Sequence, residues 1–458
     1  VDALGFYYQL DPIISPHREH FGADMIAHQE SEAWSPLADL YDQGFLDPVF
    51  EIDPQIVAIS VAFPEQAAEA MRLARKVRER DPLVHICLGG PLVSLYADKW
   101  LDDDWVFRYV DTVCVGDGET AITELAEARG GLRAWSDVRN LVWRDAEGAT
   151  VRNSAQPYLE PMDTLPVPDF KTADMGLYLT PRPIYPLMLS RGCYWGRCTF
   201  CSIGWRENYR ASSPAKIRTD VLDLVNTYGA RYIQVQDSSI PPSSARQLAR
   251  IVKDENLDVS WGGGMKFETC FTQEDYCRDL GEGRCVSLLM GFESANQEVL
   301  DLMDKGYLLE HCDAMLTNLR ASGVSVEMLW FIGFPTEERK DVLSTARYLY
   351  DRRHLFGLTA FVGDYLLHPD TIVFERPEDF GVTVIGLDND HCQYVVAKGI
   401  QPEEAQELKR LLASNNNRTL VCSGSQIPHL AEGGLDLSGL ERPMTVPEEV
   451  VAFCEPVN

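Results

Sequence analysis

The sequence predicts an α/β protein with two successive parallel sheets, a doubly wound Rossmann-like sheet followed by an open partial (β/α)6 barrel. Short apolar segments alternate with segments of helical apolar spacing between residues 56 and 119, and the alternation resumes between residues 187 and 367. Apolar strands separated by helices are typical of parallel sheets. These patterns divide the chain into four expected parts: a first domain over 1–155 with an N-terminal extension over 1–50, a linker over 156–185, a second domain over 186–370, and a small mixed or helical extension over 371–458.

The first alternation predicts strands over Ile56–Ala62, Leu83–Leu88 and Val110–Val115, with helices over Glu65–Glu79 and Val93–Leu101. In parallel sheets the ligand crevice lies beyond the carboxyl ends of the strands. A segment that carries glycine or proline follows each predicted strand, and the three segments are Phe63–Gln66, Gly89–Pro91 and Gly116–Glu119. Three such tips on one edge can hold one large ligand.

The second alternation predicts six strands with helices between them. Six βα units are too few for a closed eight-stranded barrel, so we expect an open one. The predicted strands are Leu187–Ser190, Tyr232–Gln236, Val259–Gly262, Ser287–Phe292, Val324–Ile332 and Leu358–Leu367. The predicted helices are Ala215–Tyr228, Ser243–Glu255 and Glu337–Arg352.

The composition narrows the classes of partner. A net charge of −29 argues against nucleic-acid binding, because a polyanion would be repelled. The sequence contains no apolar stretch of membrane-spanning length and no visible export signal. We therefore expect a cytoplasmic protein without a membrane partner.

Three of the twelve cysteines are closely spaced, in the pattern Cys193-x4-Cys198-x2-Cys201. Three thiolates suit iron or zinc. A structural zinc site normally has a fourth Cys or His, and none is nearby in the sequence. The pattern therefore favours an iron–sulfur cluster with one iron left open, while structural zinc and an unligated group of cysteines remain alternatives.

This segment, with Phe200 before the last cysteine, resembles the cluster loop of the radical S-adenosylmethionine (SAM) superfamily, whose usual spacing is Cys-x3-Cys-x2-Cys. The first interval here is one residue longer. The resemblance implies that Cys193, Cys198 and Cys201 hold a [4Fe–4S] cluster, and that SAM binds its open iron. We expect the extra residue to enlarge the loop and to leave the ligands unchanged.

Motifs downstream follow the order that they have in that superfamily. They are Gln236-Asp237-Ser238-Ser239, Lys266 with Glu268, Gly291-Phe292-Glu293-Ser294, and Gly333-Phe334-Pro335-Thr336-Glu337. The resemblance implies contacts to the SAM amino group, carboxylate, ribose and adenine in turn. The implied SAM-binding residues are Asp237, Ser238, Lys266, Glu268, Glu293, Ser294, Gly333 and Pro335.

The first domain resembles the cobalamin-binding domain that precedes the barrel in one branch of radical SAM enzymes. The residues that carry the resemblance, and that it implies bind cobalamin, are Ser60, Phe63, Pro64, Glu65, Gln66, Gly89, Gly90, Pro91, Gly116, Asp117, Gly118 and Glu119. A nucleotide-binding, flavin-binding or inert sheet remains the alternative. Because the surroundings of His85 do not match Asp-x-His-x-x-Gly, we expect cobalamin without a histidine ligand below cobalt.

The resemblance implies a class B radical SAM methyltransferase that methylates an unactivated carbon through a 5′-deoxyadenosyl radical and methylcobalamin. It implies a small-molecule, natural-product or peptide substrate and an external one-electron reductant of the flavodoxin or ferredoxin type. Candidate substrate contacts are Tyr365, His368, Trp330 and Trp205. Two alternatives stay open: a radical rearrangement, oxidation or cyclisation without net methylation, and a non-catalytic iron–sulfur or cobalamin sensor.

Overall fold

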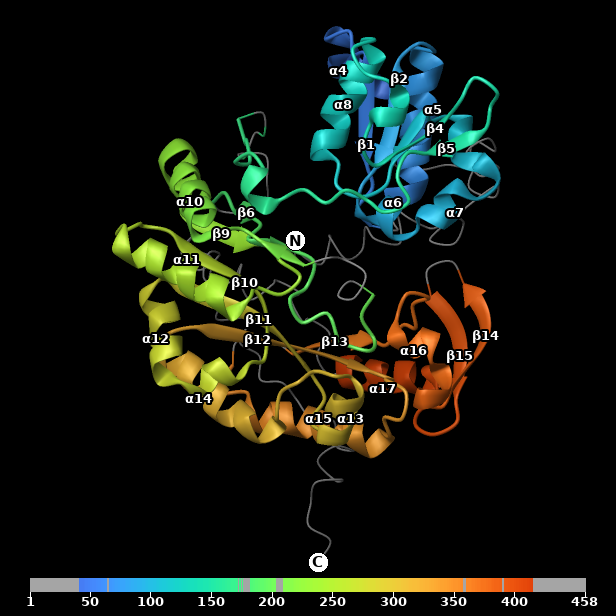
Figure 1. Ribbon diagram of the computed structural model, residues 1–458. Helices are drawn as coiled ribbons and strands as arrows, with labels where there is room; N and C mark the ends of the chain where they lie inside the picture. Colours follow the sequence, from blue (N-terminus) through green and yellow to red (C-terminus); the bar gives the residue numbers. More distant parts are fainter. Residues whose placement is uncertain are drawn as a thin grey trace, which may run out of the picture. The chain divides into compact units, whose positions relative to one another are not determined.

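The computed structural model describes residues 41–63, 66–171, 173, 175, 182–202, 209–356, 360–388 and 391–414. The chain forms two compact units, the first extending to Pro161 and the second beginning at Met162 (Figure 1). No helix in the described part of the chain has both the length and the apolar composition that crossing a membrane requires.

The first unit is built on a five-stranded sheet with the order β1-β2-β3-β4-β5. Strands β1 to β3 are parallel, and β4 and β5 continue the sheet in antiparallel pairing. The strands are β1 (Ile56–Ser60), β2 (His85–Gly89), β3 (Thr112–Cys114), β4 (Leu141–Arg144) and β5 (Thr150–Arg152). The helices are α4 (Asp47–Glu51), α5 (Ala67–Arg80), α6 (Pro91–Leu95), α7 (Ala97–Leu101) and α8 (Glu119–Arg129).

Helices cover both faces of this sheet, as a doubly wound arrangement requires. Successive strand residues point to opposite faces. In β2, Ile86 and Leu88 pack in one core cluster with α5, α6 and α7, while Cys87 packs in a separate cluster with α8. Apolar residues on both faces of β2 explain why its sequence is a continuous apolar run. The α/β class and the Rossmann-like sheet are thus confirmed.

The second unit contains a six-stranded, all-parallel sheet with the order β13-β12-β11-β10-β9-β6. Its strands are β6 (Tyr185–Leu187), β9 (Tyr232–Val235), β10 (Ser260–Lys266), β11 (Cys285–Glu293), β12 (Ser325–Ile332) and β13 (Ala360–Asp364). This is the open partial barrel that the sequence predicts.

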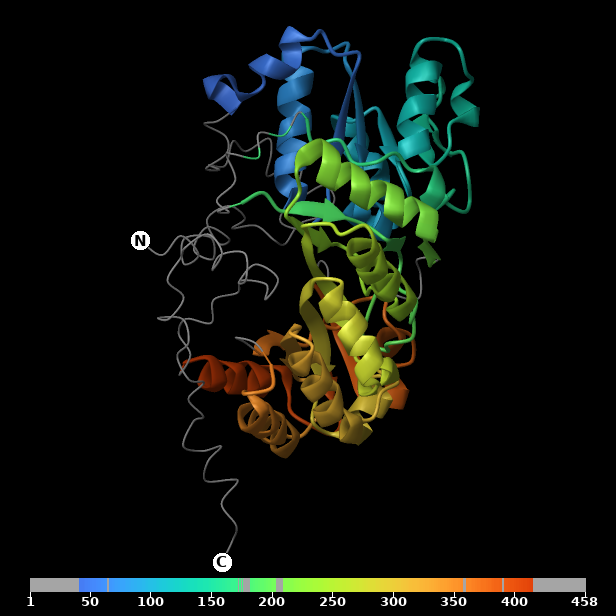
Figure 2. The ribbon, with the colours of Figure 1, turned by 90° about the vertical axis from the view of Figure 1, so that its left-hand side faces the viewer.

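The helices between these strands lie along one side of the sheet (Figures 1 and 2). They are α10 (Pro214–Tyr228), α11 (Pro242–Asp254), α12 (Glu274–Glu282), α13 (Gln297–Leu302), α14 (Cys312–Ala321) and α15 (Arg339–Arg352). Helix α10 shows how the sequence sets their ends. Ser213 caps its first turn by accepting from the Lys216 amide, and Gly229 ends it in the left-handed region.

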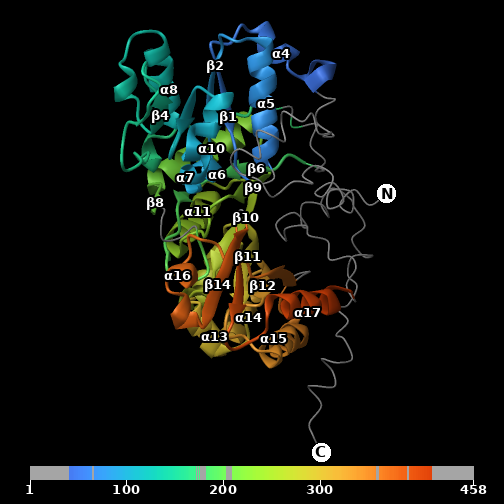
Figure 3. The same cartoon turned by 90° about the vertical axis from the view of Figure 1, so that its right-hand side faces the viewer.

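The residues after β13 combine helices with a small sheet. They form α16 (Ile372–Glu375), the two-stranded sheet of β14 (Val382–Asp388) and β15 (His391–Val396), and α17 (Pro402–Ser414). Helix α17 packs against β12 and β13 (Figure 3).

Strand β10 extends to Lys266, four residues beyond the predicted end at Gly262. The run Gly262–Gly264 counts against a strand because glycine weakens strand interiors. Packing explains it here, since a Cβ at Gly262 would lie 2.6 Å from Ser287 Oγ and 2.7 Å from Tyr232 OH. The antiparallel strands β4 and β5 are not among the strands that the sequence analysis predicts.

Leu88 is fully buried in β2, whereas Leu83, which precedes β2, is 81% exposed. We expect Leu88→Ala to lower the free energy of unfolding of the first unit by about 2–5 kcal/mol, because it leaves a cavity. The matched variant Leu83→Ala should have little effect. Urea denaturation of the full chain, with hydrogen exchange measured on peptides of β1 to β3, tests this. Equal effects of the two variants would contradict the assignment of Leu88 to the core.

Candidate functional site

The first unit brings its three predicted tips together at the carboxyl edge of the parallel strands. Ser60 pairs with Gly89 in the β1–β2 register, and the Val61 amide donates to the Gly89 carbonyl at 2.8 Å. Ser94, which the sequence analysis did not single out, joins the other two tips. Its hydroxyl donates to the Gly90 carbonyl at 3.0 Å and accepts from the Gly116 amide at 2.9 Å.

Gly90 is required by the fold at this edge. Its φ is +108°, and a Cβ there would lie 2.5 Å from the Val61 carbonyl oxygen. Gly116 has φ +113°, and its Cβ would lie 2.8 Å from Pro157. The backbone conformation and the packing at both positions therefore require glycine.

The remaining predicted cobalamin residues differ in their surroundings. The Asp117 carboxylate accepts from the Glu160 amide at 2.7 Å, and Gln66 accepts from the amides of Ala62 and Phe63. Phe63 is 63% exposed. Pro91 and Gly118 are exposed and Glu119 is half-buried. Pro64 and Glu65 lie outside the described residues.

His85 lies at the other end of β2 from Gly89. It is buried, with a ring nitrogen 3.0 Å from Thr112 Oγ1, and burial lowers its pKa. The absence of a histidine ligand to cobalt stays a prediction, but His85 itself does not reach the three tips.

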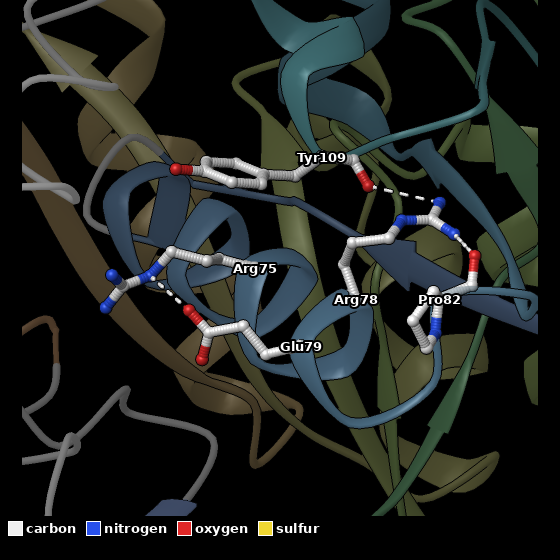
Figure 4. Close-up of a pocket in the computed structure, with 5 residues that line it drawn as sticks. All are labelled: Arg75, Arg78, Glu79, Pro82 and Tyr109. Atoms are coloured by element: carbon white, nitrogen blue, oxygen red, sulfur yellow. Dashed lines mark hydrogen bonds and ion pairs between the residues drawn. The ribbon is translucent and has the colours of Figure 1, made fainter.

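A cavity of 490 Å³ also lies away from the tips, lined by Arg75, Arg78, Glu79, Pro82 and Tyr109 (Figure 4). Arg78 donates to the carbonyls of Pro82 and Tyr109, and Arg75 pairs with Glu79. Its charged groups thus have partners within the protein, and we assign the cavity no cofactor.

In the second unit, a short antiparallel ladder encloses the cysteine loop. It pairs β7 (Ser190–Arg191) with β8 (Arg210–Ala211). Gly192 and Gly196 have positive φ and let the loop turn. The Cys201 amide donates to the Cys198 carbonyl at 3.2 Å.

Cys193, Cys198 and Cys201 form no disulfide bond, and each is partly buried. The pKa of Cys198 is raised to about 11, mainly by burial; the Lys305 ammonium opposes this shift, and the charges of Cys201, Glu293 and Cys193 add to it. Within the described residues, no three Cys, His, Asp or Glu side chains are arranged to hold a single metal ion. A [4Fe–4S] cluster spreads its thiolates over separate irons, so three cysteines of one loop without a disulfide, with the Lys305 ammonium nearby, fit that group.

Asp237 follows β9 and is almost fully buried, at 7% exposure. Its Oδ1 accepts from the Leu189 amide at 2.7 Å, and its Oδ2 accepts from the Ser190 hydroxyl. Burial raises its pKa to about 6, although both hydrogen bonds oppose the shift. Each carboxylate oxygen can accept a further hydrogen bond. The neighbouring Ser238 is exposed.

Lys266 uses all of its donors within the protein. Its ammonium donates to the carbonyls of Phe267 and Lys305 and lies 3.0 Å from Glu268 Oε1. An ammonium has three N–H donors. In this arrangement no donor of Lys266 remains for a SAM carboxylate, so its position does not favour the predicted contact. Glu268 also accepts from the Tyr194 hydroxyl at 2.8 Å.

Glu293 and Lys305 form a buried ion pair with 2.9 Å between Oε1 and Nζ. A bulge follows Gly291 in β11, and Glu293 has φ +66°. A Cβ at Gly291 would lie 2.4 Å from Glu293 Oε1, so glycine makes room for the pair. Sequence reasoning gave Lys305 no role, because nothing in the sequence signals its pairing with Glu293.

The other predicted SAM residues are buried at strand ends. Ser294 is fully buried, and its hydroxyl accepts from the Asn296 amide. Gly333 has φ +99° and donates its amide to Glu337 Oε2 at 2.8 Å, and Pro335 is buried. Within the part of the chain that the structure describes, Glu337 Oε1 has no hydrogen-bond partner, and burial raises the pKa of this carboxyl to about 8.

The predicted substrate contacts occupy different places. Tyr365 is buried, and its hydroxyl has no hydrogen-bond partner among the described residues. The centroid of its ring lies 5.9 Å from that of Phe331. Trp330 belongs to the core between the sheet and the helices, whereas Phe331 packs on the other face of the sheet. The position of Trp330 therefore does not favour contact with a substrate. His368 is half-buried, and its carbonyl accepts from the Thr371 hydroxyl. Trp205 lies outside the described residues.

Two family models match the chain. The radical SAM superfamily matches residues 187–349, and the B12 binding domain matches residues 37–126. The first match covers the cysteine loop and strands β9 to β12, and the second covers the three tips of the first sheet. A radical SAM domain implies a [4Fe–4S] cluster and SAM, and a B12-binding domain implies cobalamin.

Curated relatives of low identity carry related names. "Uncharacterized methyltransferase PH0819" of Pyrococcus horikoshii is 26% identical over 65% of this chain and 64% of its own length. "Anaerobic magnesium-protoporphyrin IX monomethyl ester cyclase" of Rubrivivax gelatinosus is 22% identical over 68% of this chain and 57% of its own. "Cobalamin-dependent radical SAM methyltransferase TokK" of Streptomyces tokunonensis is 23% identical over 83% and 58%. The chain thus spans about three fifths of their length.

Solved structures share the fold. The cobalamin-dependent SAM radical enzyme OxsB aligns with a TM-score of 0.63 and 14% identity, over 82% of this chain and 60% of its own. The radical SAM methyltransferase TsrM of Kitasatospora setae aligns with a TM-score of 0.57 and 17% identity, over 86% and 81%. The chain therefore joins a B12-binding domain to a radical SAM domain and is homologous to the cobalamin-dependent radical SAM methyltransferases.

Proposed function

We propose that this protein is a class B radical SAM methyltransferase, which methylates an unactivated carbon of a small-molecule, natural-product or peptide substrate. The observation that carries the proposal is the presence of a B12-binding and a radical SAM domain in one chain. Relatives named as methyltransferases support it, among them one named as cobalamin-dependent. An external one-electron reductant belongs to the proposal, because cleavage of SAM consumes an electron.

A second candidate is a radical oxidation or cyclisation without net methylation. The relative named as a magnesium-protoporphyrin IX monomethyl ester cyclase favours it. The first unit and the cysteine loop serve either outcome equally well, so the products must separate the two candidates.

When bound, the cluster supplies an electron for SAM cleavage and cobalamin supplies the methyl group. The chain's own residues bind and orient these groups. We assign Cys193, Cys198 and Cys201 to the cluster, and the three tips of the first sheet to cobalamin. Glycine at the tips lets the backbone approach a large ligand closely.

We assign Asp237 to the SAM amino group, because its carboxylate is fixed by two hydrogen bonds and keeps acceptor capacity. We assign Tyr365 to the substrate. Its buried hydroxyl has no hydrogen-bond partner among the described residues, and a bound substrate can supply one.

Products of SAM under anaerobic reconstitution with cobalamin and dithionite test the reaction class. We expect 5′-deoxyadenosine and S-adenosylhomocysteine together. Cys198→Ala should lose cluster absorbance and 5′-deoxyadenosine while it retains cobalamin. Cys270 lies outside the loop and forms no disulfide, so the control variant Cys270→Ala should keep both the cluster absorbance and the formation of 5′-deoxyadenosine. Deoxyadenosine without S-adenosylhomocysteine would refute methylation, and its formation by Cys198→Ala would refute the cluster assignment.

SAM affinity should depend on pH through Asp237, whose pKa burial raises to about 6. Above pH 7 the group is a carboxylate and accepts a strong hydrogen bond from the amino group. Below pH 6 it becomes protonated, and we expect affinity on the order of tenfold weaker. Equilibrium dialysis of SAM between pH 5.5 and 8 measures this. Asp237→Asn should bind more weakly at pH 8 with a flatter profile, and an unchanged profile would contradict the role.

Tyr365→Phe separates a substrate contact from a structural role. The hydroxyl is buried and unpaired, so its removal should leave the melting temperature unchanged or slightly higher. Once screening has found a substrate, the rate at which the variant forms methylated product should be about tenfold lower or more. A drop in the melting temperature with normal turnover would show that the hydroxyl stabilises the fold instead.

A further inference from the structure

The longer first interval of the cysteine loop contains Trp195, and this ring is seated on a distant segment of the chain. Its indole nitrogen donates to the Asp304 carbonyl at 2.7 Å. A Cβ at Gly306 would lie 2.2 Å from the Cη2 atom of the ring. Gly306 therefore leaves the space that the indole fills.

Two cations lie over the same ring. Lys266 Nζ is 4.1 Å from the ring centroid, and the Arg197 guanidinium is 4.9 Å from it. Arg197 also pairs with Asp304 at 3.0 Å. A cation over an aromatic face is attracted by the ring quadrupole, and indole is the strongest such face.

Neighbouring contacts attach the rest of the loop to the same segment. The Thr199 amide donates to the Met303 carbonyl at 3.1 Å, and its hydroxyl donates to the Leu302 carbonyl at 2.8 Å. Lys266 donates to the Lys305 carbonyl, so it links strand β10 to this segment and to the indole at once. The cysteine loop is thus packed and hydrogen-bonded, through residues 194–199, against residues 302–306.

We propose that Trp195 is a positioning residue for the cluster, and that the four-residue interval exists in this chain to accommodate its ring. The indole fixes the loop between Cys193 and Cys198 on Gly306. It also holds the Lys266 ammonium beside the loop, where a fixed positive charge raises the reduction potential of a cluster. The inference rests on the proposed function only in assigning the cluster to the three cysteines.

The test compares Trp195→Leu, Trp195→Phe and Gly306→Ala after anaerobic reconstitution with iron and sulfide. The readouts are the electron paramagnetic resonance spectrum of the reduced cluster and its midpoint potential, with the melting temperature as a check on folding. Trp195→Leu removes the aromatic face, so we expect an altered spectrum and a lower potential. Trp195→Phe keeps an aromatic ring beneath Lys266, so its spectrum and midpoint potential should stay close to those of the wild type.

Gly306→Ala keeps the indole but places a methyl group in the space that the ring fills. It should therefore reproduce the effects of Trp195→Leu. Gly229→Ala is the matched control, because Gly229 has φ +66° against +69° at Gly306 but nothing within 4 Å of its added Cβ. The double variant Trp195→Phe/Gly306→Ala should recover part of the wild-type spectrum, since the smaller ring leaves room for the methyl group.

A wild-type spectrum and potential in both Trp195→Leu and Gly306→Ala would overturn the inference. Equal spectral changes in Gly306→Ala and Gly229→Ala would overturn it as well, because strain alone would then explain them. Failure of the wild-type protein to assemble a [4Fe–4S] cluster would instead refute the proposed function. The two failures are therefore distinguishable.

Discussion

Parallel pairing of the barrel strands is the constraint on which the candidate site depends. It brings the carboxyl ends of β9 to β12 to one edge, although the residues beyond those ends lie far apart in the sequence. Asp237 follows β9, Lys266 ends β10, Glu293 ends β11 and Gly333 follows β12. The register is fixed by the apolar residues that face the helices, since a shift by one residue would turn them to the other face.

Burial of charge at this edge sets the second constraint. Lys266 is 5% exposed and Lys305 is 6% exposed. Burying an ammonium group without partners costs free energy. Lys305 is compensated by Glu293, and Lys266 by Glu268 and two carbonyls. These interactions are complete within the chain. Among the described residues, buried oxygens of Glu337, Asp364 and Tyr365 lack a hydrogen-bond partner, so they keep capacity to bind something else.

The sequence predicts more of the fold than of the contacts. Apolar alternation is a local signal, and it located β9 to β13, whereas the predicted strand Leu187–Ser190 overlaps β6 only at Leu187. The spacing of Cys193, Cys198 and Cys201 singled out the cysteine loop. The partner of each charged side chain is a long-range property. Nothing in the sequence around Lys266 shows that its donors are taken by Phe267, Lys305 and Glu268. Nor does the local sequence tell which of Trp330 and Phe331 faces the helices, since both are apolar.

Glycine in a motif has more than one physical cause, and the first unit separates them. Gly90 and Gly116 combine a positive φ with close approach of other atoms, so the fold alone requires them. Gly118 has φ −102°, and an added Cβ would meet nothing within 4 Å. Neither backbone strain nor packing within the unit explains glycine there. Gly118 is the N-cap of α8, where glycine is among the favoured residues, so the start of the helix can account for it.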